Sequence, residues 1–258
     1  MTTATATLPR TAATPLNRIT RVVKLNLANP MTTVGTPWLI LGAIFLLTLA
    51  IGLLIRANID PADQAQASDG MQWSGAASWI FVYMMVVAVQ TMNLTFPLAL
   101  GYGSTRRDFY LGSSLTFVLL SAMWAVGLTV LAVLERVTDG WGLGVRMFTA
   151  VYFGGIDVPA WERLVIYFCG MLFFFFLGAA VAAVYVRWKT SGLVVFFITT
   201  GALLVGVIAL LTWGRLWGVV GTILSDAQAL GVALWLLVPA AIAAVAGFVI
   251  LRGATPRS

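Results

Sequence analysis

The sequence predicts an all-α, polytopic membrane protein with six transmembrane helices and both termini in the cytoplasm. Three observations lead to this prediction: the composition, six long uncharged apolar runs, and the uneven distribution of basic residues. The chain is 60% hydrophobic and has a mean hydropathy of +0.97, whereas soluble domains contain about 45–50% apolar residues. No run alternates as barrel strands do, and open sheets cannot satisfy their backbone in lipid. A helical bundle is therefore expected.

Each of the six apolar runs is close to the length that a membrane helix requires. About 20 residues are needed to cross about 30 Å of hydrocarbon, and none of these runs contains a charged residue. The runs are Pro37–Ile55, Trp79–Tyr102, Leu111–Leu134, Leu164–Val186, Leu193–Trp213 and Leu230–Leu251.

The charges between the runs predict the orientation. With the N-terminus inside, the outer connections carry five arginines and eight acidic residues, and the inner segments carry ten basic residues and one acidic residue, Asp108. Cytoplasmic loops are enriched in Lys and Arg, so both termini are expected inside. The inner basic residues are Arg10, Arg18, Arg21, Lys24, Arg106, Arg107, Arg187, Lys189, Arg252 and Arg257.

The N-terminal region divides into two parts ahead of the six-helix domain, which is expected over 31–258. Residues 1–15 are rich in Thr and Ala and predict a disordered cytoplasmic leader. Residues 16–30 predict an amphipathic helix in the lipid headgroup plane, with a solvated helix or an ordinary basic flank as the alternatives. Its apolar residues recur every three or four positions and its cations share another face: Leu16, Ile19, Val23 and Leu27 against Arg18, Arg21 and Lys24.

The second apolar run contains a cluster of uncharged polar residues. Gln90, Thr91 and Asn93 are followed by Pro97, which frees a carbonyl group and is expected to kink the helix. Polar groups in lipid seek partners on neighbouring helices. The cluster could line or gate a pathway, or could form ordinary interhelical hydrogen bonds; the sequence leaves both open.

Two outer connections are expected to contain structure of their own. Residues 136–162 mix aromatic residues with glycines and are predicted to rest partly on the outer interface, where aromatic rings are favoured. Residues 214–228 are too short to span and too apolar for a free loop. A short re-entrant or interfacial helix is expected there.

No arrangement for catalysis, metal binding or nucleotide binding is present in the sequence. The chain has no histidine and one cysteine, Cys169, and it lacks the glycine-rich phosphate-binding loop of P-loop ATPases. No ionisable residue lies in the middle of an apolar run, which argues against ion-coupled transport. The net charge of +6 is dispersed around apolar runs, so nucleic acid is not an expected partner. Energy for any transport must come from outside this chain.

The segment Pro97–Gly112 is the one charged break between Asp69 and Glu135. It contains Gly103, Ser104, Thr105, Arg106, Arg107, Asp108 and Phe109. This stretch, together with the predicted topology, resembles the permease subunits of type-2 ABC exporters. In that family a cytoplasmic turn after the second span has a similar glycine, serine, arginine and phenylalanine pattern.

The resemblance implies a transporter assembled from several subunits. Two permease copies, or this chain and a sister permease, would work in a bacterial cell membrane with two copies of a P-loop ATPase that holds ATP and Mg²⁺. The chain itself would be no enzyme and would bind no cofactor. The turn would be the coupling contact through Gly103, Ser104, Arg106, Arg107, Asp108 and Phe109, flanked by Arg18, Arg21 and Lys24. The substrate would be an amphiphilic drug, peptide or lipid-like molecule. The alternative is a membrane scaffold or sensor that anchors a cytoplasmic partner.

Overall fold

The computed structural model describes residues 15–60, 70, 73 and 75–253, and this part of the chain is helical and contains no strand. The predicted leader and most of the first outer connection lie outside the described residues. The helices are α1 (Pro15–Asn26), η1 (Met31–Gly35), α2 (Thr36–Asn58), α4 (Trp79–Gln90), η2 (Thr91–Thr95), α5 (Phe96–Gly101), α6 (Arg106–Val137), η3 (Gly140–Gly144), η4 (Val151–Phe153), α7 (Ala160–Trp213), α8 (Trp217–Trp235) and α9 (Leu237–Arg252).

Five helical segments among the described residues are long and apolar enough to cross a membrane. Such a set indicates a multi-pass membrane protein. The segments are Met31–Asn58, Trp79–Gly101, Arg106–Val137, Ala160–Trp213 and Trp217–Arg252.

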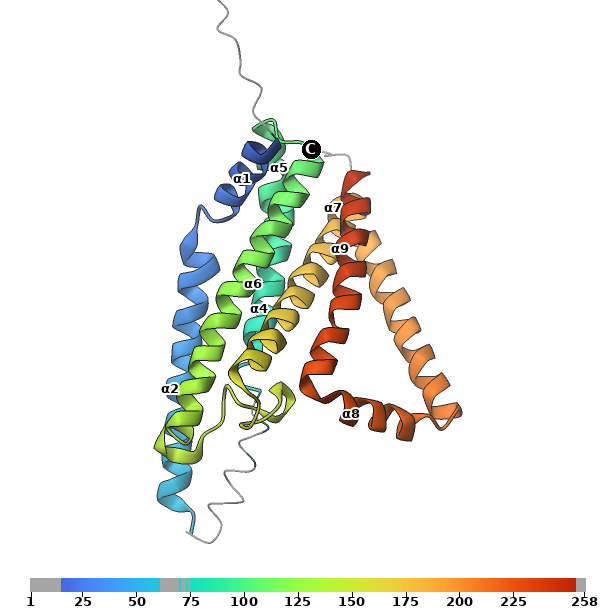
Figure 1. Cartoon of the computed structure of the whole chain (residues 1–258). Helices are drawn as coiled ribbons and strands as arrows, with labels where there is room; N and C mark the ends of the chain where they lie inside the picture. The colour runs from blue at the N-terminus through green and yellow to red at the C-terminus, as the bar shows by residue number, and fades with distance from the viewer. Residues whose placement is uncertain (1–14, 61–69, 71–72, 74, 254–258) are drawn as a thin grey trace, which may run out of the picture.

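Helix α7 contains two of the six predicted runs. Its backbone leaves helical geometry at Lys189, where φ is 56° and ψ is −149°. Figure 1 shows the consequence: α7 rises to one end of the bundle, reverses there, and a second arm descends away from the first. The runs Leu164–Val186 and Leu193–Trp213 fall on the two arms. Six separate crossings and their orientation stay predictions.

The core lies between α4, α6 and the first arm of α7. Phe117 stacks on Phe175 with ring centroids 5.0 Å apart, and both side chains are fully buried. On the facing side of α7, Gly178 lies so close to α4 that an added Cβ would overlap the Met85 carbonyl group. Small residues allow helix backbones to approach closely in membranes. This face of α7 therefore packs against α4 of the same chain.

The second arm of α7 and the following α8 stand apart from this core. Figure 1 shows α8 running across the base of a triangle whose sides are the second arm and α9. Most large apolar side chains on the arm are exposed, including Ile198 at 66% and Leu210 at 70%. Helix α8 breaks at Gln228, where φ is 52° and ψ is −176°. The short helix expected over 214–228 is therefore present, from Trp217 to this break.

A π-helix stands where the sequence predicts a kink before Pro97, and the kink itself stays a prediction. Helix α4 passes into η2 and then into α5, which has Pro97 in its first turn. Proline has no N–H for the carbonyl of Asn93, four residues earlier, so an α-helical bond is missing there. A π-bulge is a recognised response to such a disruption.

Candidate functional site

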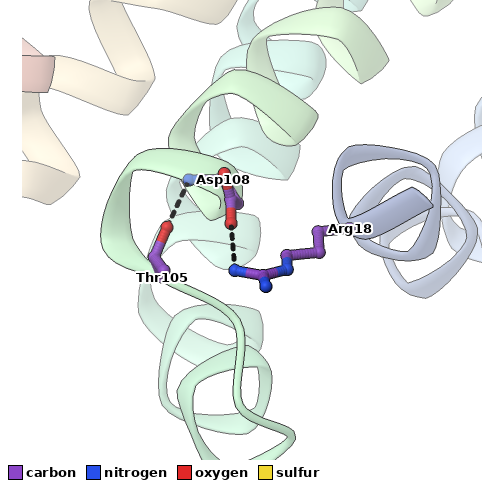
Figure 2. Close-up of polar contacts among 3 residues, drawn as sticks. All are labelled: Arg18, Thr105 and Asp108. Atoms are coloured by element: carbon purple, nitrogen blue, oxygen red, sulfur yellow. Dashed lines mark hydrogen bonds and ion pairs between the residues drawn. The ribbon is translucent and has the colours of Figure 1, made fainter. Parts of the chain in front are cut away.

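The charged turn joins α5 to α6 through four residues. Gly103 has φ +80°, a conformation that favours glycine, and its N–H bonds the Leu100 carbonyl at 2.9 Å. Thr105 is the N-cap of α6, and its hydroxyl accepts a hydrogen bond from the Asp108 N–H at 3.1 Å (Figure 2). The Asp108 carboxylate lies in the first turn of α6, where the helix dipole favours negative charge. The turn is thus defined by its own local chemistry.

Helix α1 lies against this turn through an ion pair. Figure 2 shows Arg18 reaching from α1 to Asp108, with an Nη1 to Oδ2 distance of 3.8 Å. The Arg18 side chain is 40% exposed and that of Asp108 13% exposed. The Asp108 carboxylate already interacts with Arg18 and with the N-terminus of α6. It is therefore poorly placed to contact a partner protein.

The seat of α1 continues along α6. Val22 is buried, and a Cβ added to Gly112 would come within 2.6 Å of it. Asn26 Nδ2 donates to Ser113 Oγ at 3.1 Å. The buried face of α1 therefore differs from the predicted apolar face. The prediction omitted Val22, which is buried, and included Leu16, which is 71% exposed. Periodicity alone could not reveal this, because the buried face is the one that meets the groove at Gly112.

The turn also contacts the end of α9. Arg106 Nη1 donates to the Arg252 carbonyl oxygen at 3.1 Å. Arg252 is the last residue of α9, so a cation here meets both an unpaired carbonyl and the negative end of the helix dipole. The turn is in this way tied to α1, α6 and α9 together. Figure 1 places the adjoining ends of these helices at one end of the bundle.

The structure separates the residues that the sequence grouped as partner contacts. Arg107 and Gly103 are exposed, as are Arg21 and Lys24 on α1, and Arg18 and Ser104 are half-buried. Phe109 is fully buried and lies 5.2 Å from Phe96 between ring centroids. Its side chain anchors the turn to α5 and offers no surface to a partner. The exposed set is the candidate docking surface.

The residues of the polar cluster differ in burial. Thr91 is buried, whereas Gln90 and Pro97 are exposed. The Oδ1 atom of Asn93 is buried and has no hydrogen-bond partner among the described residues. A pathway or gate built from these residues stays a prediction.

The sequence did not single out a second polar centre at the opposite end of the bundle. Glu135, near the end of α6, is fully buried. Its carboxylate accepts hydrogen bonds from the backbone N–H groups of Met147 at 2.9 Å, Phe148 at 3.0 Å and Thr149 at 2.8 Å. The Thr149 hydroxyl donates to it at 2.6 Å, and Trp141 Nε1 at 3.4 Å. One carboxylate therefore holds three consecutive amides.

Arg163 and Tyr167, on α7, bind the carbonyl groups of the same connection. Arg163 is 2% exposed, and its guanidinium donates to the carbonyl oxygens of Gly155 and, at 3.4 Å, Phe148. The Tyr167 hydroxyl also donates to the Phe148 carbonyl. From the sequence, Glu135 and Arg163 read as solvated loop charges, because each lies just beyond an apolar run. Only the tertiary fold reveals their burial.

Part of the connection 136–162 is buried against the bundle, which the sequence did not predict. The position of the rest at the outer interface stays a prediction. Met147, Phe148, Thr149 and Ala150 are all buried, and Phe153 is 7% exposed. Figure 1 shows the connection folded back against the ends of α6 and α7. Two aromatic residues behave as expected and stay exposed, Tyr152 at 41% and Trp161 at 62%. The buried part is drawn inward by Glu135 and Arg163.

Neither centre contains the elements of a catalytic or metal site. Within the described residues, no three His, Cys, Asp or Glu side chains are grouped so that they could hold a metal ion. Comparison of the chain with protein families, with curated proteins and with solved structures finds no match. The resemblance to type-2 ABC exporter permeases stays a prediction from the residues of the turn and the order of the apolar runs.

Proposed function

We propose that this chain is the permease subunit of an ATP-driven exporter and receives mechanical work from a separate P-loop ATPase at the turn 102–109. One observation carries the proposal: the turn is bonded to α1 through Arg18, continuous with α6, and bonded to α9 through Arg106. A load applied at the turn would therefore reach three helices. The partner would supply ATP and Mg²⁺, because this sequence has no phosphate-binding loop.

The docking surface would be the exposed cationic face beside the turn. Arg107, Arg21 and Lys24 are exposed and are not committed to the ion pair of Figure 2. Exposed cations suit an acidic groove on a partner protein, because opposite charges attract the two proteins as they diffuse together and so increase the association rate. Arg106 and Asp108 would act inside the turn and transmit the load.

The working assembly would contain two permease copies with six crossings each and both termini inside. The reversal of α7 at Lys189 supports separate fourth and fifth crossings. The exposed apolar arm 190–213 leaves a surface on which a second copy or sister permease would pack. The assembly would move an amphiphilic drug, peptide or lipid-like molecule out through a bacterial cell membrane.

The decisive experiment is co-purification with a P-loop ATPase and measurement of its ATP hydrolysis. We expect the native chain to retain the ATPase and stimulate it, and Arg107→Glu to abolish both. Arg136→Glu is the matched control, because Arg136 is an exposed arginine at the other end of α6; it should leave both unchanged.

Two results would contradict the proposal. One is the absence of any co-purifying ATPase. The other is an ATPase whose rate does not depend on the permease. A partner that binds through Arg107 but hydrolyses no ATP would favour a scaffold or sensor.

A further inference from the structure

The backbone of residues 145–149 is held by side chains instead of by a helix or strand. Its N–H groups at 147, 148 and 149 all donate to Glu135, as described above. A buried amide without a partner is costly. Three consecutive amides of the segment therefore share one acceptor, the Glu135 carboxylate. Removing that acceptor would affect three backbone groups at once.

The carbonyl groups of the segment depend on α7 in the same way. Arg163 and Tyr167 serve the carbonyls of Phe148 and Gly155. Side chains of α7 thus donate to carbonyl groups of the connection, and a side chain of α6 accepts from its N–H groups. We call residues 145–149 the strip. We call Glu135, Arg163 and Tyr167 the latch.

Glycines with positive φ flank the latched strip on both sides. Gly140, Gly142 and Gly144 precede it with φ of 67°, 72° and 68°. Gly154 and Gly155 follow it with φ of 94° and 72°. Glycine passes between such conformations with little steric cost. Release of the latch would let the backbone between these glycines rotate outward.

Beyond the strip, Tyr152 and Phe153 line a partly open apolar cavity of about 300 Å³. Phe174 from α7 and Ala233 from α8 also line it. Ser78 lies at the cavity, where its hydroxyl donates to the Tyr152 hydroxyl at 3.0 Å. Burial raises the pKa of Tyr152, and the hydrogen bond from Ser78 opposes part of the rise. The Ser78 and Tyr152 hydroxyls at the cavity are therefore both uncharged at physiological pH.

We propose that residues 145–153 form a latched lid along one side of this cavity, which binds the hydrocarbon part of an amphiphile with its polar group near Ser78 and Tyr152. Pockets for small molecules combine mainly apolar walls with a few placed polar groups, as here. Release of the Glu135 latch would let Tyr152 and Phe153 move away from the cavity and admit the ligand more readily. The choice of an amphiphile rests on the proposed export function, whereas the lid and the cavity do not.

The lid is tested by the reactivity of a buried cysteine. Met147→Cys, in a Cys169→Ala background and in nanodiscs, is treated with a charged maleimide; Met147 is fully buried in the latched state. We expect Glu135→Gln to raise the labelling rate at least tenfold. The Gln NH₂ group is a hydrogen-bond donor, and it would face the backbone N–H groups that the carboxylate accepts from. Glu162→Gln, a half-buried acid in the first turn of α7, should not change it. Equal rates for the two variants would overturn the lid.

Hydrogen exchange of the unsubstituted chain gives the same test without a substitution. We expect the amides of 147–149 to exchange together and faster than those of the central α6 helix. Exchange as slow as that of α6 would overturn a lid that opens.

The cavity is tested with a photoreactive dodecylphosphocholine that carries a diazirine at the chain end. We expect adducts near Phe174 and Ala233, a loss of at least fivefold in Ala233→Trp, and faster labelling in Glu135→Gln. Ala122→Trp is the control, because Ala122 lines a separate apolar recess of about 150 Å³; it should keep the adducts. Equal labelling in Ala233→Trp, or labelling that Glu135→Gln does not alter, would overturn the proposal. No ATPase is present, so either failure leaves the proposed function untouched.

Discussion

The two charged connections at opposite ends of the bundle are built in opposite ways. The turn at 102–109 uses an ion pair of 3.8 Å whose arginine is 40% exposed. The lid uses a fully buried carboxylate that accepts from three consecutive amides and a hydroxyl. Exposed ion pairs contribute little and exchange readily, whereas a buried charge that loses its partners is strongly destabilising. The comparison sets a partly exposed ion pair at one end against a fully buried carboxylate at the other.

Loss of the Glu135 carboxylate should have the largest effect on stability. Glu135→Ala leaves three amides, the Thr149 hydroxyl and the Trp141 indole N–H without their acceptor, so we expect a loss of about 3–5 kcal/mol of unfolding free energy. Reversible unfolding in mixed detergent micelles would measure it. A loss below 1 kcal/mol would contradict the difference between the two ends.

Filling the seat of α1 should have the next largest effect. Gly112→Leu forces a side chain into Val22 and the Ile19 carbonyl, so we expect α1 to detach at a cost of about 1–3 kcal/mol. Gly101→Leu is the control, because a Cβ there meets nothing within 4 Å. Distances between spin labels on α1 and α6 should lengthen only in the first variant. Unchanged distances would mean that α6 relaxes to keep α1 in place.

Arg106 and Arg107 should separate transmission from docking. Arg106→Ala removes the bond to the end of α9 and should lower stability by about 0.5–1.5 kcal/mol. Arg107→Ala should change stability by less than about 0.5 kcal/mol, because its side chain is exposed, yet weaken the partner complex. Thermal unfolding and partner affinity, measured on both variants, test this split. Equal effects on both quantities would refute it.

The Arg18–Asp108 ion pair should have the smallest effect. Arg18→Ala is expected to cost at most about 1 kcal/mol, and the difference should vanish in 1 M salt. A stability titration against ionic strength is the measurement. A salt-independent loss of several kcal/mol would show that this pair behaves as a buried one.

Several features of the fold could be predicted because they depend on short stretches of chain. The apolar runs on α2, α4, α6 and α7 follow from the length that lipid demands. The α6 cap at Thr105 and the break before Pro97 follow from local backbone chemistry. The face of a span that packs inward could not be predicted, because a helix that is apolar all round gives no periodic signal.

The sequence by itself determined the apolar helices, the charged turn between two of them, and the absence of a phosphate-binding loop or histidine chemistry. Only the tertiary structure decided that α1 lies on α6 at Gly112, that Phe109 is an anchor, and that Glu135 is a buried latch. The physical reason is the range of the interactions. Hydrophobic length and capping act within one segment, whereas a buried carboxylate is stable only where distant backbone groups converge on it.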